Sequence, residues 1–183
     1  MLHAHTSNQP APQQRQQGWA KATDKELIAH VLERYHVRHR KQLPELIGLS
    51  EKVERLHAEH PDAPTGLAAH LVDMLQELES HMQKEEHILF PMILRGQKTM
   101  AVGPISVMES EHVQHMEALQ KMLMLAHQLQ LPEAACNSWQ ALYVGIGELR
   151  DDLMEHIRLE NEFLFKRNTS NAEHMCCGGC GGR

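Results

Sequence analysis

The chain carries two copies of one short pattern, His81-Met-Gln-Lys-Glu85 and His156-Ile-Arg-Leu-Glu160. Each copy places an imidazole and a carboxylate four residues apart, so both side chains point from the same face of a helix. An imidazole and a carboxylate from each of two helices can hold non-haem iron inside a helical bundle. A single zinc ion would not need two such arms, so the repeated pattern predicts a dinuclear metal site.

The composition narrows the class of protein. A chain of 183 residues fits one domain that can bury a core without disulfides. Aromatic residues make up only 4%, whereas there are 11 Met and 15 His, which favours an all-helical protein. The net charge of -6 and the lack of a basic run argue against a nucleic-acid partner. No apolar stretch approaches the ~20 residues of a membrane span, and no secretory signal is evident. We therefore expect a cytoplasmic protein.

Capping residues, prolines and glycines divide the chain into four expected helices. They are expected over residues 23–60 with a kink at Pro44, 67–94, 104–129, and 132–165. Short connections between long helices favour an up-down-up-down four-helix bundle, here residues 23–166. We expect a disordered polar arm at 1–22 and a flexible Cys/Gly-rich tail at 167–183.

Each expected helix offers a candidate ligand for the metal site. At about 1.5 Å per residue, their levels along the bundle differ by about 3 to 12 Å, which slanted helices can absorb. The candidates form a layer close to the end that carries both chain termini. His57 is excluded, because a continuous helix would place it about 31 Å from His36. The candidates are His36 on the first helix, His81 and Glu85 on the second, His112 on the third, and His156 and Glu160 on the fourth.

A rival ligand set remains open. The stretches Glu33-Arg-Tyr-His36 and Glu109-Ser-Glu-His112 are Glu-x-x-His pairs, which are typical of ferritin-like di-iron proteins. That carboxylate-rich set would indicate an oxidase or an iron-storage protein. We favour the histidine-rich set, because it uses both histidines of the repeated pattern and leaves Glu33 and Glu109 exposed. Iron suits both sets.

The remaining histidines are expected to have lesser roles. His39, His87 and His115 are expected beside the site or on the surface, and His30, His60, His70 and His127 on the surface.

Four stretches of the chain, in order, closely resemble the hemerythrin-like domain of the bacterial repair-of-iron-centres (RIC) proteins. They are residues 34–40, 81–91, 103–112 and 151–161, and the resemblance covers about residues 24–166. It implies two non-haem iron ions per chain and a role in nitrosative and oxidative stress. It also implies terminal ligands His36, His81, His112 and His156, bridging ligands Glu85 and Glu160, and acidic neighbours Glu77 and Glu111.

The chain departs from this family at its ends. Typical RIC proteins carry a small N-terminal domain with a vicinal Cys-Cys-Gly-Gly motif, whereas this chain has a short polar arm there. It has instead a similar string near the C-terminus, with Cys176, Cys177 and Cys180. These cysteines are either a thiolate site for iron or a redox relay, or they belong to a tail without a role.

Two classes of function follow. The first is a binding protein whose reduced di-iron centre captures nitric oxide and lowers free NO in the cytoplasm. The second is the repair of damaged iron–sulfur clusters by iron donation to apo iron–sulfur proteins, or the reduction of NO to N2O. The missing N-terminal cysteine domain favours capture, with O2 carriage a weaker third. We expect a binding protein rather than a turnover enzyme, as a monomer or homodimer.

Overall fold

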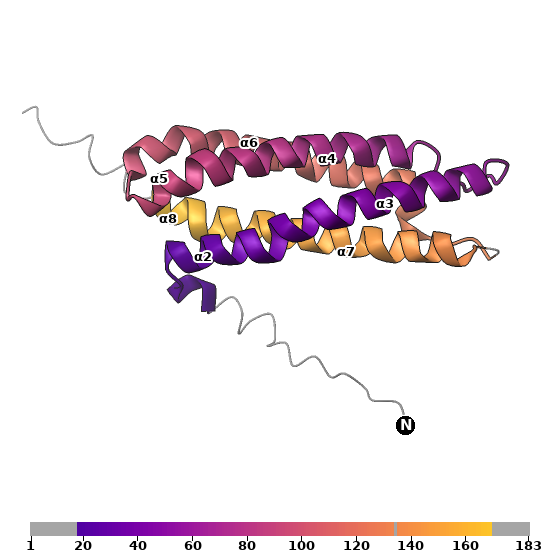
Figure 1. Ribbon diagram of the computed structural model, residues 1–183, viewed down its shortest axis with the longest axis horizontal. Coiled ribbons are helices and arrows are strands. Elements are labelled where there is room, and N and C mark those ends of the chain that lie inside the picture. Colours follow the sequence, from indigo (N-terminus) through magenta and orange to yellow (C-terminus); the bar gives the residue numbers. More distant parts are fainter. Residues whose placement is uncertain (1–17, 134, 170–183) are drawn as a thin grey trace, which may run out of the picture.

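The computed structural model describes residues 18–133 and 135–169, in which four long helical segments pack into a bundle (Figure 1). The first segment comprises α2 (Asp24–His30), a π-helical turn η1 (Val31–His36) and α3 (Val37–Leu56). The second comprises α4 (Leu67–Lys84), a π-helical turn η2 (Glu85–Leu89) and α5 (Phe90–Leu94). The third is α6 (Lys98–Leu125). The fourth comprises α7 (Asn137–Leu159), a π-helical turn η4 (Glu160–Phe165) and α8 (Lys166–Thr169). This confirms the predicted all-helical bundle.

Local sequence explains where the first two segments begin and end. The Thr23 hydroxyl accepts a hydrogen bond from the Glu26 amide at 3.2 Å, and the Glu26 carboxylate accepts one from the Thr23 amide at 2.8 Å. This capping box starts the first segment where the sequence predicted. The segment ends at Leu56 rather than near His60 and continues through Pro44. Gly66, with φ of +86°, then adopts the left-handed conformation that precedes α4.

The third segment begins earlier than predicted. We expected a loop over residues 95–103 and a helix from Pro104, but α6 already starts at Lys98 and contains Pro104 in its second turn. Ala101 and Ile105 are both fully buried against the ends of the neighbouring segments. Burial of this extra turn offsets the hydrogen bond that the proline removes.

The connection between the third and fourth segments also differs from the prediction. The third segment ends at Leu125, and a short 3-10 turn η3 (His127–Leu129) follows, in which all three residues have positive φ. A left-handed turn of non-glycine residues carries no clear sequence signal. The fourth segment starts at Asn137, after Cys136 as its N-cap, rather than at Pro132.

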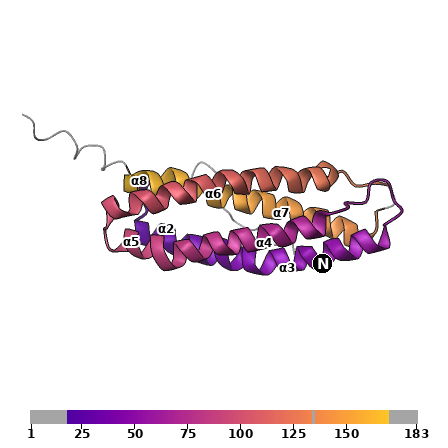
Figure 2. The same cartoon turned by 90° about the horizontal axis from the view of Figure 1, so that it is seen from above.

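The fourth segment extends to Thr169, beyond the expected end near Phe165. Its last turn is tied to the start of the first segment. The Arg167 guanidinium donates to the Ala22 carbonyl at 2.6 Å, and the Asn168 amide donates to the Asp24 carboxylate at 3.3 Å. The described chain therefore begins and ends at the same end of the bundle as α5, as Figures 1 and 2 show.

The interior consists of two apolar clusters. One lies at the end with α2, α5 and α8 and includes Ile105, Phe90 and Phe165. The other fills the longer opposite part and includes Leu71, Leu142 and Trp139. The buried histidines and glutamates of the candidate metal site fall between these two clusters in every segment. The site is therefore a polar layer across an otherwise apolar bundle.

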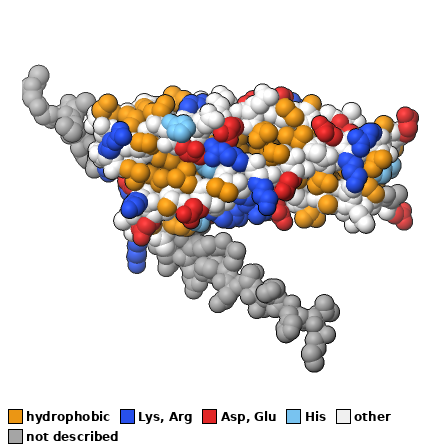
Figure 3. Space-filling model, viewed as in Figure 1, with side chains coloured by type: hydrophobic (Ala, Val, Ile, Leu, Met, Phe, Trp, Pro, Cys, Tyr) orange, Lys and Arg blue, Asp and Glu red, His pale blue; other side chains and the backbone are white. Residues whose placement is uncertain are grey.

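One face of the bundle carries a mixture of side-chain types. On the face drawn in Figure 3, acidic, basic and hydrophobic side chains are interspersed along the bundle. Among the described residues, no helix is sufficiently long and apolar to cross a membrane.

Candidate metal centre

All six predicted metal ligands lie together in the polar layer. They form two groups of four that share both glutamates, and the potential ligand atoms of each group lie within 4.8 Å of one another. Each of the six is at most 2% exposed. The groups are the His36/His156 half and the His81/His112 half, each completed by Glu85 and Glu160.

Each glutamate reaches both halves. One oxygen of Glu85 lies 3.3 Å from Nε2 of His36, and the other lies 3.4 Å from Nε2 of His81. One oxygen of Glu160 lies 3.2 Å from Nε2 of His112, and the other lies 3.2 Å from Nε2 of His156. A carboxylate placed in this way can bridge two metal ions.

The polar atoms of the layer fit a metal centre. Both oxygens of Glu85 and both oxygens of Glu160 are buried without a hydrogen-bond partner among the described residues. The same holds for the Nε2 atoms of His36 and His156. Nε2 of His81 and Nε2 of His112 face each other at 3.1 Å. Buried carboxylates and imidazoles left in this state would be costly. Two metal ions bound by these atoms would satisfy them, and the set of imidazole and carboxylate donors suits iron.

Charged groups within the layer shift the pKa values of their neighbours. Burial lowers the pKa of His81, but the adjacent negative charge of Glu85 outweighs it and raises this pKa to about 9. Burial raises the pKa of Glu160, but the charge of His156 and the neighbouring imidazoles hold it well below the usual range. Without metal, a proton on His81 therefore offsets part of the carboxylate charge, and a metal ion bound there must displace that proton.

The Nδ1 atoms of three candidate ligands have outer hydrogen-bond partners. His36 bonds to Glu86 at 2.7 Å, and Arg40 donates to the same Glu86 oxygen at 2.8 Å. His112 bonds to Asn161 at 2.8 Å. Such partners fix the orientation and tautomer of a ligating imidazole. Glu86 and Asn161 were not predicted; each directly follows one of the two shared glutamates, at the start of a π-helical turn.

The third outer partner is Glu111, one of the two acidic neighbours that the family resemblance implied. Its carboxylate lies 2.9 Å from Nδ1 of His81 and also contacts the Lys84 ammonium. Burial raises the pKa of Glu111, but the hydrogen bonds from Lys84 and His81 outweigh it and lower this pKa. The other neighbour, Glu77, is exposed and lines a surface hollow together with Lys84, Glu111 and His115.

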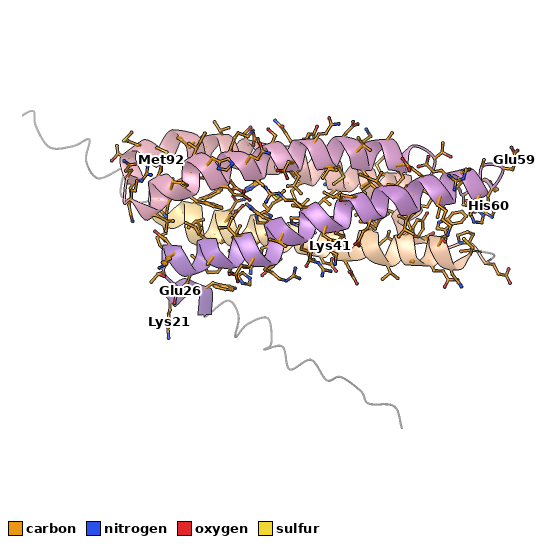
Figure 4. The ribbon with its side chains drawn as sticks, in the orientation of Figure 1. Lys21, Glu26, Lys41, Glu59, His60 and Met92 are labelled. Carbon is orange, nitrogen blue, oxygen red and sulfur yellow. The ribbon has the colours of Figure 1, made fainter. Side chains whose placement is uncertain are left out.

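The carboxylates of the rival ligand set and His57 lie outside the polar layer. Glu33 and Glu109, the carboxylates of the rival ferritin-like set, are exposed. His57 lies far from the centre, because it contacts Cys136 and Trp139 at the opposite end of the bundle, the end where Figure 4 labels its neighbour His60. The tail cysteines Cys176, Cys177 and Cys180 lie outside the described residues.

Three other histidines of the described residues are buried. His39 follows His36 by one turn and packs 5.4 Å from the ring of His156, and His115 follows His112 by one turn and packs 4.9 Å from the ring of His81. His70 was expected on the surface, and this prediction was wrong. It is only 6% exposed, and its Nε2 lies 2.8 Å from the Ala118 carbonyl oxygen.

Comparisons with known proteins agree with this geometry. Residues 27–167 match the family described as Hemerythrin HHE cation binding domain. The chain is 52% identical over 159 residues to "Iron-sulfur cluster repair protein YtfE" of Citrobacter koseri, an alignment that covers 87% of this chain and 72% of that protein. It is also 52% identical over 157 residues to the proteins of the same name from Escherichia coli O81 and Escherichia fergusonii, covering 86% of this chain and 71% of each. The chain therefore belongs to the hemerythrin HHE family, in the group of the YtfE repair-of-iron-centres proteins.

Proposed function

We propose that this protein holds two iron ions in the polar layer and donates iron for the repair of iron–sulfur clusters. The observation that carries the proposal is the pair of buried His/Glu groups that share Glu85 and Glu160. Similarity to proteins named for iron–sulfur cluster repair supports this use of the site. It reverses the order expected from the sequence, where NO capture came first and repair second.

Few protein ligands hold each ion in this assignment. Each half offers two imidazoles and one oxygen from each of two shared carboxylates. Iron bound in this way supplies exchangeable coordination positions and one-electron redox chemistry. His36, His81, His112 and His156 would be terminal ligands, and Glu85 and Glu160 would be bridges.

The surface next to the centre offers a route for a cation. The hollow lined by Glu77, Lys84, Glu111 and His115 has a volume of about 300 Å³. Glu111 connects this hollow to the centre, because its carboxylate touches both Lys84 at the rim and His81 inside. Glu77 and Glu111 would attract a ferrous ion that leaves or enters, in line with the acidic role that the resemblance implies.

The test follows iron from this protein to a damaged cluster. The chain is loaded anaerobically with ⁵⁷Fe(II) and mixed with an NO-damaged [4Fe–4S] protein, in the presence of a chelator that captures free ferrous iron. We expect ⁵⁷Fe to appear in the repaired cluster by Mössbauer spectroscopy. Recovery only when the chelator is omitted, or no recovery at all, would contradict iron donation. A Glu85→Leu variant that retains less iron provides the matched control.

NO binding is a second candidate, because the described residues offer four ligands to each half, and a six-coordinate iron ion would have further positions for a diatomic molecule. The reduced protein is titrated anaerobically with NO while its EPR spectrum and the gas phase are followed. A tight, stoichiometric nitrosyl without N2O would support capture, and continued release of N2O would support reduction. Neither result replaces the transfer experiment, since one centre can bind NO and donate iron.

A further inference from the structure

The two halves of the proposed centre differ in the hydrogen bonds that support their histidines. In the His81/His112 half, both imidazoles have an outer partner, Glu111 and Asn161 respectively. In the other half, His36 has Glu86, but Nδ1 of His156 is buried without a hydrogen-bond partner in the described part of the chain. His156 is therefore the one candidate ligand whose orientation no hydrogen bond fixes among the described residues.

The four segments are related by an approximate two-fold symmetry, in which the first corresponds to the third and the second to the fourth. This symmetry shows which residue is responsible for the difference. The residue after each bridging glutamate supports a histidine of another segment: Glu86 supports His36, and Asn161 supports His112. By the same relation, the residue before His112 and the residue before His36 should support the remaining two histidines. Glu111 does so for His81, whereas the corresponding residue before His36 is Tyr35.

Tyr35 packs against the ring of His156 instead of accepting a hydrogen bond from its Nδ1. The two rings are parallel within 5°, with centroids 5.1 Å apart, and Tyr35 is only 5% exposed. The rings of His36 and His39 also pack against His156, with centroids 5.1 and 5.4 Å away, and both ring nitrogens of His39 are buried without a partner among the described residues. Within residues 18–133 and 135–169, His156 is therefore held by ring contacts rather than by a hydrogen bond from its Nδ1 to an acceptor.

Loss of an outer hydrogen-bond partner typically lowers metal affinity by about 10–100-fold, because the imidazole becomes less basic and its orientation less fixed. We infer that the ferrous ion held by His36 and His156 is the one that leaves first. This half is labile because Tyr35 stands where the other half has the carboxylate of Glu111. The inference rests on the proposed iron centre. The ion leaves as Fe²⁺, so no electron transfer is required.

Chelation kinetics test this inference. The chain is loaded with two Fe(II) anaerobically and mixed with excess bipyridyl, and the coloured complex is followed in time. We expect two phases of equal amplitude whose rates differ by about 10–100-fold. If the chain holds fewer than two irons, the proposed centre itself is contradicted. If two irons leave in a single phase, the centre stands and only the inequality of its halves is contradicted.

Two substitutions assign the phases to the halves. Asn161→Ala removes the acceptor of His112, so the slow phase should approach the fast one. Asn137→Ala, at the exposed start of the same segment, is the matched control and should keep both phases. Tyr35→Glu, or Tyr35→Gln if a buried carboxylate prevents folding, should slow the fast phase.

A spectroscopic measurement separates these effects from a general loss of stability. The labile position is emptied by brief chelation and refilled with ⁵⁷Fe, so that only this position gives a Mössbauer signal. This signal identifies the labile position in the spectrum of the unmodified chain. With both positions of each variant loaded with ⁵⁷Fe, Tyr35→Gln should change this component of the spectrum, whereas Asn161→Ala should change only the other component. The reverse pattern would place the labile ion in the His81/His112 half and overturn the inference. Faster loss of the labile ion in His39→Leu would show that His39 supports His156 and would overturn the role given to Tyr35.

Discussion

Glu85 and Glu160 occupy equivalent positions at the start of two π-helical turns, η2 and η4, and each directs one oxygen to each half of the proposed centre. In a π-helical turn the backbone departs from the regular α-helical hydrogen-bond pattern, often at functional sites. Both carboxylates are fully buried between the two apolar clusters of the bundle. The two halves are therefore joined through these carboxylates, and neither half is complete without both.

Replacing either bridge should disrupt both metal positions at once. We expect Glu85→Leu and Glu160→Leu to lower iron to one or fewer per chain, because each substitution removes an oxygen ligand from both halves. Iron is counted by elemental analysis after anaerobic loading and desalting. Circular dichroism checks that the variant remains helical.

Exposed glutamates provide the matched controls for the bridging variants. Glu33→Leu and Glu109→Leu change the carboxylates of the ferritin-like alternative, which point to solvent. We expect both variants to retain two irons. Loss of iron in these two, with retention in the bridging variants, would restore the carboxylate-rich ligand set.

Metal removal should destabilise the folded chain. The oxygens of Glu85 and Glu160 have no hydrogen-bond partner in the described residues, so metal ions are the groups that would satisfy them. At free iron 100-fold above the dissociation constant, one ion adds about 2.7 kcal/mol to the free energy of unfolding. For a domain of this size, this corresponds to a rise in Tm of roughly 5–10 °C per ion. Anaerobic differential scanning calorimetry with and without a chelator measures it, and an unchanged Tm would count against metal binding in this layer.

The helices could be predicted because their signals are local. The Thr23 capping box and the turn before Gly66 mark segment ends directly in the sequence. The start of α6 could not be predicted, because it depends on burial of Ala101 against other segments, and Pro104 favours a helix start in isolation. The left-handed turn at residues 127–129 likewise depends on how α6 and α7 meet.

Some residues of the metal site could likewise be predicted from the sequence, and others could not. The four-residue spacing of His81 and Glu85 is a helical signal that sequence shows plainly. Glu86 and Asn161 could not be found in this way, because adjacent residues on an α-helix lie about 100° apart around its axis and seldom serve one site. Tyr35 gave no signal either, since its effect is visible only when it is compared with Glu111 in the folded bundle.

The stability of the metal-free protein should fall as the pH rises above neutrality. In the folded state Glu85 raises the pKa of His81 to about 9 against the effect of burial, and the pKa of an unfolded histidine is about 6.5. His81 therefore contributes stability that is fully present below pH 6.5 and is lost as the pH rises through about 9. The pKa of the nearby His115 is lowered to about 3 by burial, so that group is already neutral above pH 6.5 and does not oppose this loss.

Thermal unfolding of the metal-free chain at pH 7 and pH 9.5 measures this effect. We expect a lower Tm at pH 9.5 and a weaker dependence in His81→Gln, which has no proton to lose. The iron-loaded chain should not show this loss, because an imidazole that binds metal through Nε2 has already released that proton. An equally steep decline in His81→Gln would assign the effect to another group.

His57 should be dispensable for iron although it directly follows the segment that carries His36. Its Nε2 lies 3.1 Å from the Cys136 thiol, and its ring lies 4.8 Å from that of Trp139, at the end of the bundle away from the polar layer. We expect His57→Ala to retain two irons and to lose about 1 kcal/mol of unfolding free energy through these contacts. His36→Ala, the matched change inside the layer, should lose iron. Iron analysis and urea unfolding of the two variants side by side measure both quantities, and loss of iron in His57→Ala would show that the opposite end of the bundle controls the centre.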